Sequence, residues 1–354
     1  MKKINWKKTF TGSFLTYALV IIAYVLVEVL SSTGNLSSLF KGLLVPLCTY
    51  VILAISLNLV VGILGELSLG HAGFMCVGAF SSAFFSKCTA DTITNSTIRF
   101  ILAILIGALS AALFGIIIGI PVLRLKGDYL AIVTLAFGEI IKNVVNVICI
   151  GKDSKGFHFA INKTIGVVDK DGEMIIKGAQ GITGTPNDST FTAGIILILI
   201  SIFIVTNLIK SRTGRAIMSI RDNRIAAESM GINITKYKLL SFTISAALAG
   251  VGGVLYAHNL STLTASPKNF GYNMSIMILV FVVLGGMGSI RGSMIAAVIL
   301  TVLPEKLRFL NDYRMLIYSI VLIVMMLINW NPKCRELRKK YTFKNLFHKK
   351  QEEV

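Results

Sequence analysis

The chain has 354 residues, of which 54% are hydrophobic and only 15% are charged. A soluble domain needs polar side chains to cover its core, and this composition supplies too few of them. Continuous apolar runs of about 18 or more residues suffice to cross a hydrocarbon core of ~30 Å. A transmembrane β-barrel would instead show alternating segments of ~10 residues, so this class is excluded. The sequence predicts an all-α polytopic membrane protein.

The net charge of +18 does not indicate nucleic-acid binding. The basic residues lie in loops and tails beside apolar runs, as the positive-inside rule describes, and not on one soluble face with aromatics between them. We therefore expect membrane lipid, and no nucleic acid, as a partner. The five cysteines are scattered, without a C-x-x-C pair or a histidine at metal-ligand spacing. Neither a disulfide nor a metal site is predicted.

The apolar runs predict about ten membrane segments. They fall near residues 10–30, 43–64, 67–86, 98–120, 129–150, 191–210, 238–257, 273–288, 290–304 and 313–330. The first run is too long for the apolar core of a signal peptide, so we expect a retained membrane helix. A cytoplasmic N-terminus places most Lys and Arg residues inside, including the basic tail 331–354, and makes both termini cytoplasmic. The membrane domain is expected to span residues 1–330, with cytoplasmic loop 211–237 and external polar loop 151–190.

Two apolar runs break at glycines and restart at once, at residues 62–73 and 285–292. Irregular backbone at membrane depth is tolerated where it is buried in protein or lines a wet cavity. Paired interruptions of this kind point to a translocation path. Tight helix packing through small residues, or a short turn, is the alternative explanation. The candidate path residues are Gly65, Glu66, Ser68, Gly70, His71, Gly73, Gly285, Gly286, Gly288 and Ser289.

Charged and titratable groups inside membrane segments are candidates for function by default. Glu139 and Lys142 are three residues apart on one predicted helix and can form a structural ion pair. For His71 a proton-relay role competes with a hydrogen bond to the broken backbone.

Within the external loop, Ile165–Ile176 surrounds an Asp-Gly turn, which predicts a β-hairpin, with an unstructured loop as the alternative.

The stretch IRDNRIAAESMGI (residues 220–232) predicts a short, charged, amphipathic helix between two apolar runs. Asp222 and Asn223 are good N-cap residues, Gly231 is a natural left-handed stop, and Thr235 is expected to cap the next helix. Isolated helices below ~12–15 residues are marginal, so this one needs support. Lipid headgroups, the protein's own loops and a groove in another protein are the three possibilities.

Four stretches, in this order, resemble the permeases of branched-chain amino-acid ABC transporters. They are LNLVVGILGELSLGHAGFMCVGAF (57–80), LRLKGDYLAIVTLAFGEIIK (123–142), GITGTP (181–186) and GRAIMSIRDNRIAAESMGIN (214–233), the last continuing to residue 257. The resemblance covers about residues 43 to 330 and is closest to the larger of the two paired permease subunits. The hairpin insert at 157–178 is longer than the connection usual in the family.

The resemblance implies that residues 225–231 form the coupling helix, which docks in a cleft of a separate ATP-binding subunit. The residues expected at that contact are Arg221, Asp222, Asn223, Ile225, Ala226, Ala227, Glu228, Met230 and Gly231. It further implies a second homologous permease subunit, an extracytoplasmic substrate-binding protein and a bacterial plasma (inner) membrane. The sequence contains no G-x-x-x-x-G-K-[ST] motif, so we expect no cofactor on this chain and ATP hydrolysis by the partner.

Other functions stay open at this point. Permeases for urea and short-chain amides belong to the same family. An ion-coupled carrier working alone would need Glu66, His71 or Glu139 as its titrating group. An enzyme is not expected, because the membrane runs contain no nucleophile–base pair and no two carboxylates at catalytic spacing.

Overall fold

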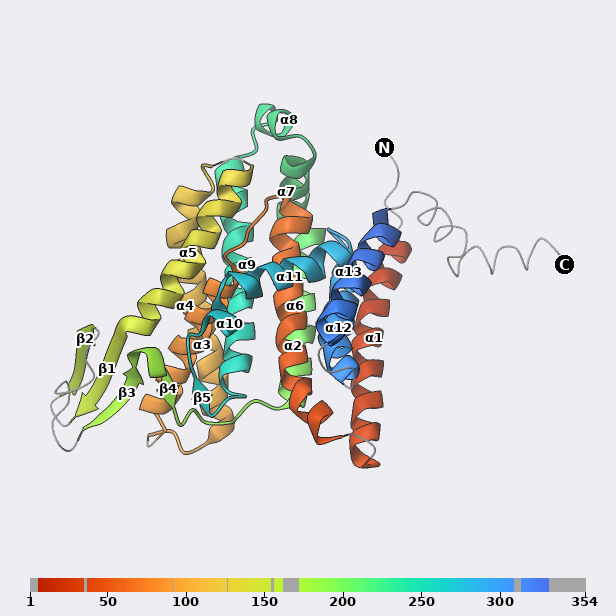
Figure 1. The fold of residues 1–354 in the computed structure, drawn as a ribbon. Coiled ribbons are helices and arrows are strands. Elements are labelled where there is room, and N and C mark those ends of the chain that lie inside the picture. The colour runs from red at the N-terminus through yellow and green to blue at the C-terminus, as the bar shows by residue number, and fades with distance from the viewer. Residues whose placement is uncertain are drawn as a thin grey trace. The chain divides into compact units, whose positions relative to one another are not determined.

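The computed structural model describes residues 6–34, 37–90, 92–125, 127–153, 156–161, 172–308 and 313–330 (Figure 1). The chain forms two compact units, Met1–Ala297 and Val298–Val354. The described strands and almost all of the described helices belong to the first unit, which also contains the candidate site.

Helices make up most of the described chain. They are α1 (Trp6–Ser32), α2 (Ser38–Asn58), α3 (His71–Cys88), α4 (Ser96–Val122), α5 (Asp128–Val147), α6 (Phe191–Lys210), α7 (Arg212–Asp222), α8 (Arg224–Ser229), α9 (Ile234–Ala257), α10 (Pro267–Phe270), α11 (Tyr272–Gly285), α12 (Ile290–Lys306) and α13 (Arg314–Trp330). A π-helical turn, η1 (Leu59–Leu64), continues α2. Each predicted apolar run overlaps one of these helices.

Seven helical segments among the described residues are long and apolar enough to cross a membrane. They are Leu15–Ser32, Ser38–Leu64, Ser96–Val122, Asp128–Val147, Phe191–Lys210, Ile234–Ala257 and Pro267–Gly285. The helices α12 and α13 have 17 residues each and are not in this set. The fold is that of a mostly helical, polytopic membrane protein.

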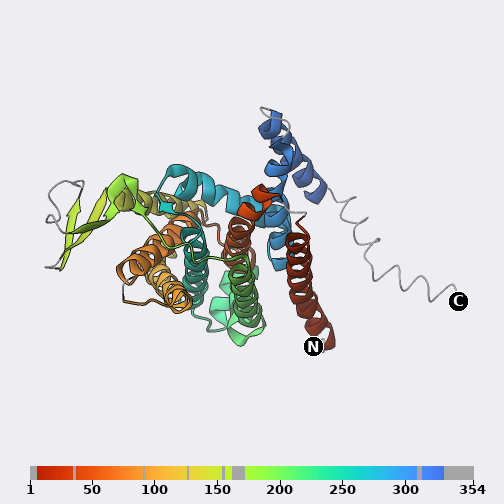
Figure 2. The same cartoon turned by 90° about the horizontal axis from the view of Figure 1, so that it is seen from below.

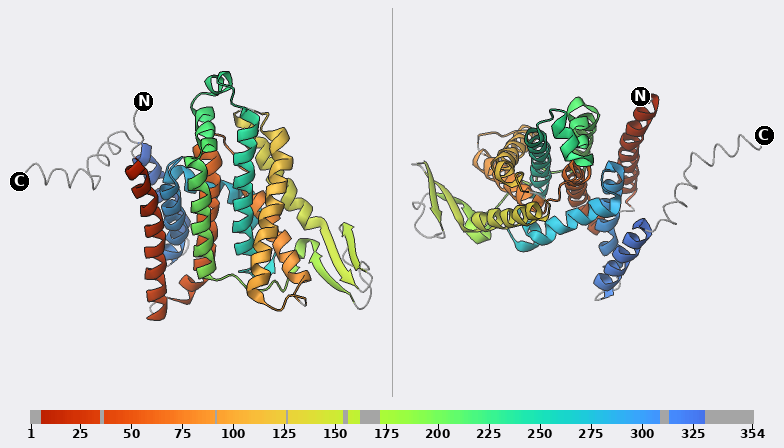
Figure 3. Two further views of the ribbon diagram at one scale, coloured as in Figure 1. Left: turned by 180° about the vertical axis from the view of Figure 1, so that it is seen from behind. Right: turned by 90° about the horizontal axis from the view of Figure 1, so that it is seen from above.

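Small residues let the central helices approach to backbone contact. The helix α9 packs against α2, α3 and α4 in the first unit (Figure 3). A Cβ atom added at Gly78 of α3 would lie 2.4 Å from Gly250 Cα, and one added at Gly253 would lie 2.1 Å from the Met75 carbonyl oxygen. Such close crossings are typical of membrane helix interfaces, where small residues bring backbones together.

The outer helices expose apolar side chains on the side away from this core. On α4 they recur every three or four residues, which is the spacing of one helix face. They are Ile98, Ile101, Leu105, Leu109, Leu113 and Ile117. This stripe faces away from the rest of the chain, so it is available to lipid or to a neighbouring membrane protein.

Two small antiparallel sheets connect the helices. The first contains β1 (Ile148–Asp153), β2 (Gly156–Ile161) and β3 (Glu173–Lys177) in the order β2-β1-β3. A 3-10 turn, η2 (Gly178–Gln180), leads to β4 (Ile182–Thr183), which pairs with β5 (Thr262–Leu263). The fold is therefore mostly helical and not strictly all-α.

The sheet corrects one predicted boundary. The apolar run 129–150 was expected to be a single membrane segment, but α5 ends at Val147 and β1 begins at Ile148. The β-branched Ile148 and Ile150 pair with Ile161 and Phe159 of the next strand, β2, and this strand pairing takes the place of the last turn of the helix. Of the hairpin predicted at Ile165–Ile176, residues 165–171 lie outside the described residues. Its second part, β3, pairs with β1.

Candidate functional site

The helix α8 has the start and stop that its sequence suggests. Asn223 is the N-cap residue, and its side-chain oxygen accepts a hydrogen bond from the Ala226 N–H at 3.0 Å. Gly231 follows the helix with φ +78°. Asp222 instead ends α7, and the expectation that Thr235 caps α9 is wrong. Asn233 occupies that position and accepts from the Lys236 N–H at 3.0 Å.

One side of α8 leans on the protein and the other is left uncovered. Ala227 is buried in a small cluster with Ile220 of α7 and Ile234 of α9. Ile225 and Met230, however, are 79% and 82% exposed. Figure 1 shows α8 projecting beyond the end of the helical bundle, above α7. Three supports were considered for this helix: lipid headgroups, the protein's own loops and a groove in another protein. The protein's own neighbouring helices cover only one face of α8.

Arg221, in the last turn of α7, connects this helix pair to the first glycine break. One terminal nitrogen of its guanidinium group donates to the Gly62 carbonyl oxygen at 2.9 Å. Its aliphatic part covers Gly65, where an added Cβ atom would lie 2.5 Å from Arg221 Cγ. Gly65 has φ +81°, so both space and backbone conformation favour glycine there.

The second glycine break meets the first at the same place. The Gly288 N–H donates to the side-chain oxygen of Asn58 at 2.9 Å, and the Asn58 amide nitrogen donates to Ser293 Oγ at 2.8 Å. A Cβ atom added at Gly62 would lie 2.2 Å from Gly288 N. We call Asn58, Gly62, Gly65, Arg221, Gly288 and Ser293 the glycine junction. It places α7, the end of α2 and the start of α12 in direct contact.

Glu66, the residue after the junction glycine Gly65, has a charged partner on the helix α9. Its carboxylate forms an ion pair with Lys238 of α9, and both side chains are largely buried. Lys238 was not predicted as a site residue, although a lysine at the start of a membrane segment is a signal that could have found it. Asn58 carried a similar signal, since it is a polar residue within an apolar run.

The rest of the first break packs against α5. Cβ atoms added at Gly70 and Gly73 would lie 2.4 Å from the Thr134 carbonyl oxygen and 2.7 Å from Gly138 Cα. These two glycines therefore serve close packing, which is the alternative considered from the sequence. Ser68 is buried, and its hydroxyl has no hydrogen-bond partner within the described part of the chain.

Side-chain hydroxyls satisfy the broken backbone at the start of α3. The Leu69 N–H donates to Thr134 Oγ1 at 3.0 Å, and the Ala72 N–H donates to Ser275 Oγ at 3.0 Å. For His71 the sequence left two roles open, a proton relay or a hydrogen bond to this backbone. Its Nε2 lies 2.6 Å from Ser56 Oγ instead, and the histidine is buried.

The remaining residues of the second break form a short turn between α11 and α12. A Cβ atom added at Gly285 would lie 2.4 Å from the Gly292 carbonyl carbon, so the two helices touch at their backbones. Gly286 has φ +96°. Ser289 Oγ accepts from the Gly292 N–H at 3.2 Å. Gly285, Gly286 and Ser289 thus shape the turn, while Gly288 makes the contact with the first break.

Glu139 and Lys142 form the predicted ion pair on α5. The second carboxylate oxygen of Glu139 also accepts from the Tyr272 N–H at 2.7 Å, at the beginning of α11. Since the Glu139 carboxylate binds both a lysine and a helix N-terminus, the geometry supports a structural role.

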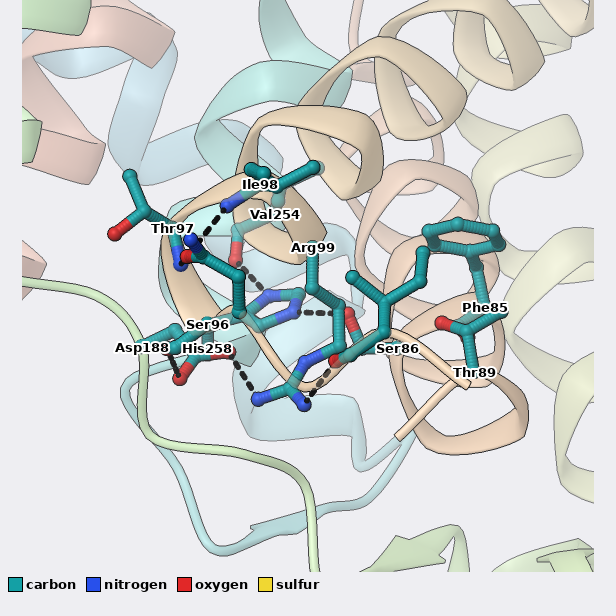
Figure 4. A network of polar contacts seen from close by, with 12 residues as sticks. Phe85, Ser86, Thr89, Ser96, Thr97, Ile98, Arg99, Asp188, Val254 and His258 are labelled. Atoms are coloured by element: carbon teal, nitrogen blue, oxygen red, sulfur yellow. Dashed lines mark hydrogen bonds and ion pairs between the residues drawn. The ribbon is translucent and has the colours of Figure 1, made fainter. Parts of the chain in front are cut away.

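A polar network at the other end of the bundle was not predicted (Figure 4). Asp188 accepts from Ser96 Oγ at 2.5 Å and from Arg99 at 3.0 Å, which ties the segment before α6 to the start of α4. His258, directly after α9, lies 2.8 Å from Ser86 Oγ of α3. These partners are up to 172 residues apart in the chain, so local sequence gave no signal for the network.

Fold and site together define a class: a polytopic membrane protein in which an exposed helix pair contacts two interrupted membrane segments. The model of a family described as "Branched-chain amino acid transport system / permease component" matches residues 39–328. The chain belongs to this family. It is a permease component of a transport system and not an enzyme.

Named relatives agree with this assignment. The chain is 35% identical over 294 residues to the high-affinity branched-chain amino acid transport system permease protein LivM of Escherichia coli (strain K12), covering 80% of this chain and 67% of the relative. LivM of Salmonella typhimurium shows the same values. The corresponding LivH of Salmonella typhimurium is 23% identical over 300 residues, 83% of this chain and 93% of the relative. No solved structure matches the chain significantly.

Proposed function

We propose that this chain is the membrane-spanning permease subunit of an ABC importer for branched-chain or related aliphatic amino acids. The substrate class is inferred from two relatives that transport branched-chain amino acids, LivM and LivH. Its partners are separate ATP-binding subunits, a second homologous permease subunit and an extracytoplasmic substrate-binding protein. ATP is bound and hydrolysed by the partner subunits and not by this chain.

The observation that carries this proposal is the exposed apolar tip of α8. Ile225 and Met230 project into solvent from a helix whose other face is fixed by Ala227. A short helix that presents two apolar side chains suits a groove on a partner protein. In this proposal the groove belongs to the ATP-binding subunit, and α8 is the coupling helix.

The connection from α8 to the membrane is supplied by Arg221. When ATP binding moves the partner subunit, α7 and α8 move with it. Arg221 then displaces the Gly62 carbonyl, and the Gly62–Gly288 contact carries the movement to the second break. Glycines with positive φ at Gly65 and Gly288 allow the backbone to hinge there without steric cost. Alternating access follows from the change in these two interrupted segments.

The proposal includes a topology. About ten membrane segments cross the bacterial plasma (inner) membrane, with both termini cytoplasmic. The loop 211–237, which contains α7 and α8, and the basic tail 331–354 lie in the cytoplasm, while 151–190 lies outside. Residues 1–330 form the permease domain.

An ion-coupled carrier has less support. Each of its three candidate groups has a protein partner: Glu66 binds Lys238, Glu139 binds Lys142, and His71 contacts Ser56. A group that takes up and releases an ion must be reachable from solvent, and in each case the protein partner occupies the position that the ion would need.

Co-purification in detergent tests the coupling helix. Gly231 and Gly127 both have positive φ and open space around an added Cβ atom, so Gly127→Trp is a matched control for Gly231→Trp. We expect ATPase subunits to accompany the tagged wild type and the control but not Gly231→Trp. A wild-type protein that purifies without any ATPase would contradict the proposal.

Uptake competition tests the substrate. Cells producing the complete transporter are given radiolabelled leucine with an excess of unlabelled valine, isoleucine or urea. We expect valine and isoleucine to compete and urea to have no effect. Competition by urea alone would assign the chain to the amide permeases instead.

A further inference from the structure

The three-stranded sheet has one apolar face. Side chains alternate along a strand, and residues directly opposite in antiparallel strands share a face. Ile148 pairs with Ile161, and Ile150 pairs with Phe159. With Phe157 these residues form what we call the apolar face of the sheet. On β1 and β2 the opposite face carries Cys149, Gly151, His158 and Ala160, and on β3 it carries Met174, which lies opposite Gly151.

Most of this apolar face is uncovered. Phe157, Phe159 and Ile161, on the edge strand β2, are 59%, 62% and 65% exposed. One ring contact is made with the body of the protein, between Phe157 and Phe84 of α3, with ring centroids 5.9 Å apart. A row of exposed aromatic and aliphatic side chains on an edge strand is unfavourable in water and marks a binding surface.

The surface next to the sheet identifies what covers it. The strand β1 begins one residue after α5, which is one of the membrane-crossing helices. The exposed side of α5 ends in Ile140, Val144 and Val147, so its lipid-facing surface runs directly into the sheet. Figures 1 and 3 show the sheet beside the ends of α3 and α4, and Figure 2 shows it extending sideways from the bundle.

A basic residue completes the pattern. Lys152 lies between Phe157 of β2 and Glu173 of β3, on the same face of the sheet as Ile148 and Ile150, and it is exposed. A lysine beside aromatic residues at the end of a membrane helix is placed to reach the phosphates of lipid headgroups while the rings enter the acyl-chain boundary. The exposed apolar side chains of the sheet follow directly on those of α5, as expected if one lipid surface covers both.

We propose that the apolar face of the sheet lies on the membrane interface, in the leaflet reached by the end of α5. Phe157, Phe159 and Ile161 enter the boundary between headgroups and acyl chains, and Lys152 binds headgroup phosphate. The sheet thereby anchors the end of α5 to the bilayer. This contact involves neither the transport path nor the ATPase subunits. Its test therefore does not depend on the proposed function.

Tryptophan fluorescence in brominated lipid tests the proposal. The two native tryptophans, Trp6 and Trp330, are replaced by phenylalanine, and a single tryptophan is introduced as Phe159→Trp or, for the opposite face, as Ala160→Trp. The full-length proteins are reconstituted into vesicles of phosphatidylcholine and phosphatidylglycerol, with bromine near the upper end of the acyl chains. We expect several-fold more quenching at position 159 than at position 160, with the reverse order for aqueous iodide.

Two outcomes would overturn the proposal. Absence of lipid quenching at both positions would mean that the sheet is exposed to water and available to a protein partner. Equal quenching at both would mean that the sheet does not present one face to lipid. If Phe159→Trp does not give a monodisperse protein, Ile161→Trp occupies the same face and replaces it in the comparison.

Discussion

Glu66 and Lys238 show how single residues at the glycine junction are held in place. A charge inside a membrane segment is stable only with a partner, and here each side chain is the partner of the other. The pair fixes the loop after Gly65 against the start of α9. His71 and Glu139 also have polar partners on other helices, Ser56 of α2 and the Tyr272 N–H of α11.

Removal of one member of the Glu66–Lys238 pair is expected to be costly. The substitution Glu66→Gln leaves a buried lysine without its carboxylate and should lower the free energy of unfolding in detergent by about 3 kcal/mol. The double variant Glu66→Gln/Lys238→Met removes both charges and should regain most of that loss. Denaturant unfolding followed by circular dichroism measures the difference. A double variant as unstable as the single one would argue against the pair.

The buried His258 predicts a dependence of stability on pH. Burial lowers its pKa below the ordinary value, although the bond to Val254 and the charge of Asp188 oppose this shift. The unfolded chain therefore binds a proton more readily than the folded one. Stability should fall as the pH drops below about 6.5, by up to about 1.4 kcal/mol per pH unit. Thermal unfolding from neutral to mildly acidic pH measures the slope, and His258→Gln should flatten it.

At the scale of elements, backbone-to-backbone helix packing decides the arrangement of the core. The glycines at the crossing of α3 and α9 leave no room for a methyl group. Strand pairing also sets a helix boundary, because pairing with β2 accompanies the end of α5 three residues before its apolar run ends.

The crossing of α3 and α9 predicts different effects for two glycines. An added methyl group at Gly253 would lie 2.1 Å from the Met75 carbonyl oxygen, whereas at Gly42 of α2 nothing lies within 4 Å. We expect Gly253→Ala to lower the free energy of unfolding by about 1–3 kcal/mol. The control Gly42→Ala should leave it unchanged or raise it slightly, because alanine favours helix. Melting temperatures in detergent compare the two, and equal values would contradict this account of the crossing.

At the scale of the whole molecule, the glycine junction is the one place where α7, α2 and α12 meet, as far as the described residues show. Two interrupted membrane segments, far apart in sequence, touch through Gly62 and Gly288. A movement of α7 therefore reaches both. This arrangement connects the exposed tip of α8 with the interior of the membrane domain.

Loss of this connection should separate ATP hydrolysis from transport. In Arg221→Ala the bond to Gly62 and the cover over Gly65 are both removed, while Ile225 and Met230, the proposed contact with the ATPase, stay in place. We expect uptake per ATP hydrolysed to fall about tenfold, the size of a typical coupling energy, with the complex still assembled. Arg212→Ala, an exposed arginine at the start of the same helix, is the control. Equal effects of the two substitutions would exclude a specific role for Arg221.

The sequence predicted much of the local structure. Composition alone indicated a polytopic membrane protein. The predicted glycine breaks fall where helices end, and α8 begins after Asn223 and ends before Gly231, as predicted. Two interpretations failed where several polar side chains compete for the same backbone groups. Thr235 lost the cap to Asn233, and His71 binds a serine rather than the broken backbone.

Sequence by itself determined which segments are apolar, where they break and which short helix carries the family's motif, because these depend on side-chain hydrophobicity and local backbone preference. Only the tertiary structure decided which polar groups meet. Arg221 lies 159 positions from Gly62, and Asn58 lies 230 from Gly288. Such contacts depend on how helices cross, and that is set by packing among many residues at once. The apolar face of the sheet was likewise decided by strand register, which no single strand specifies alone.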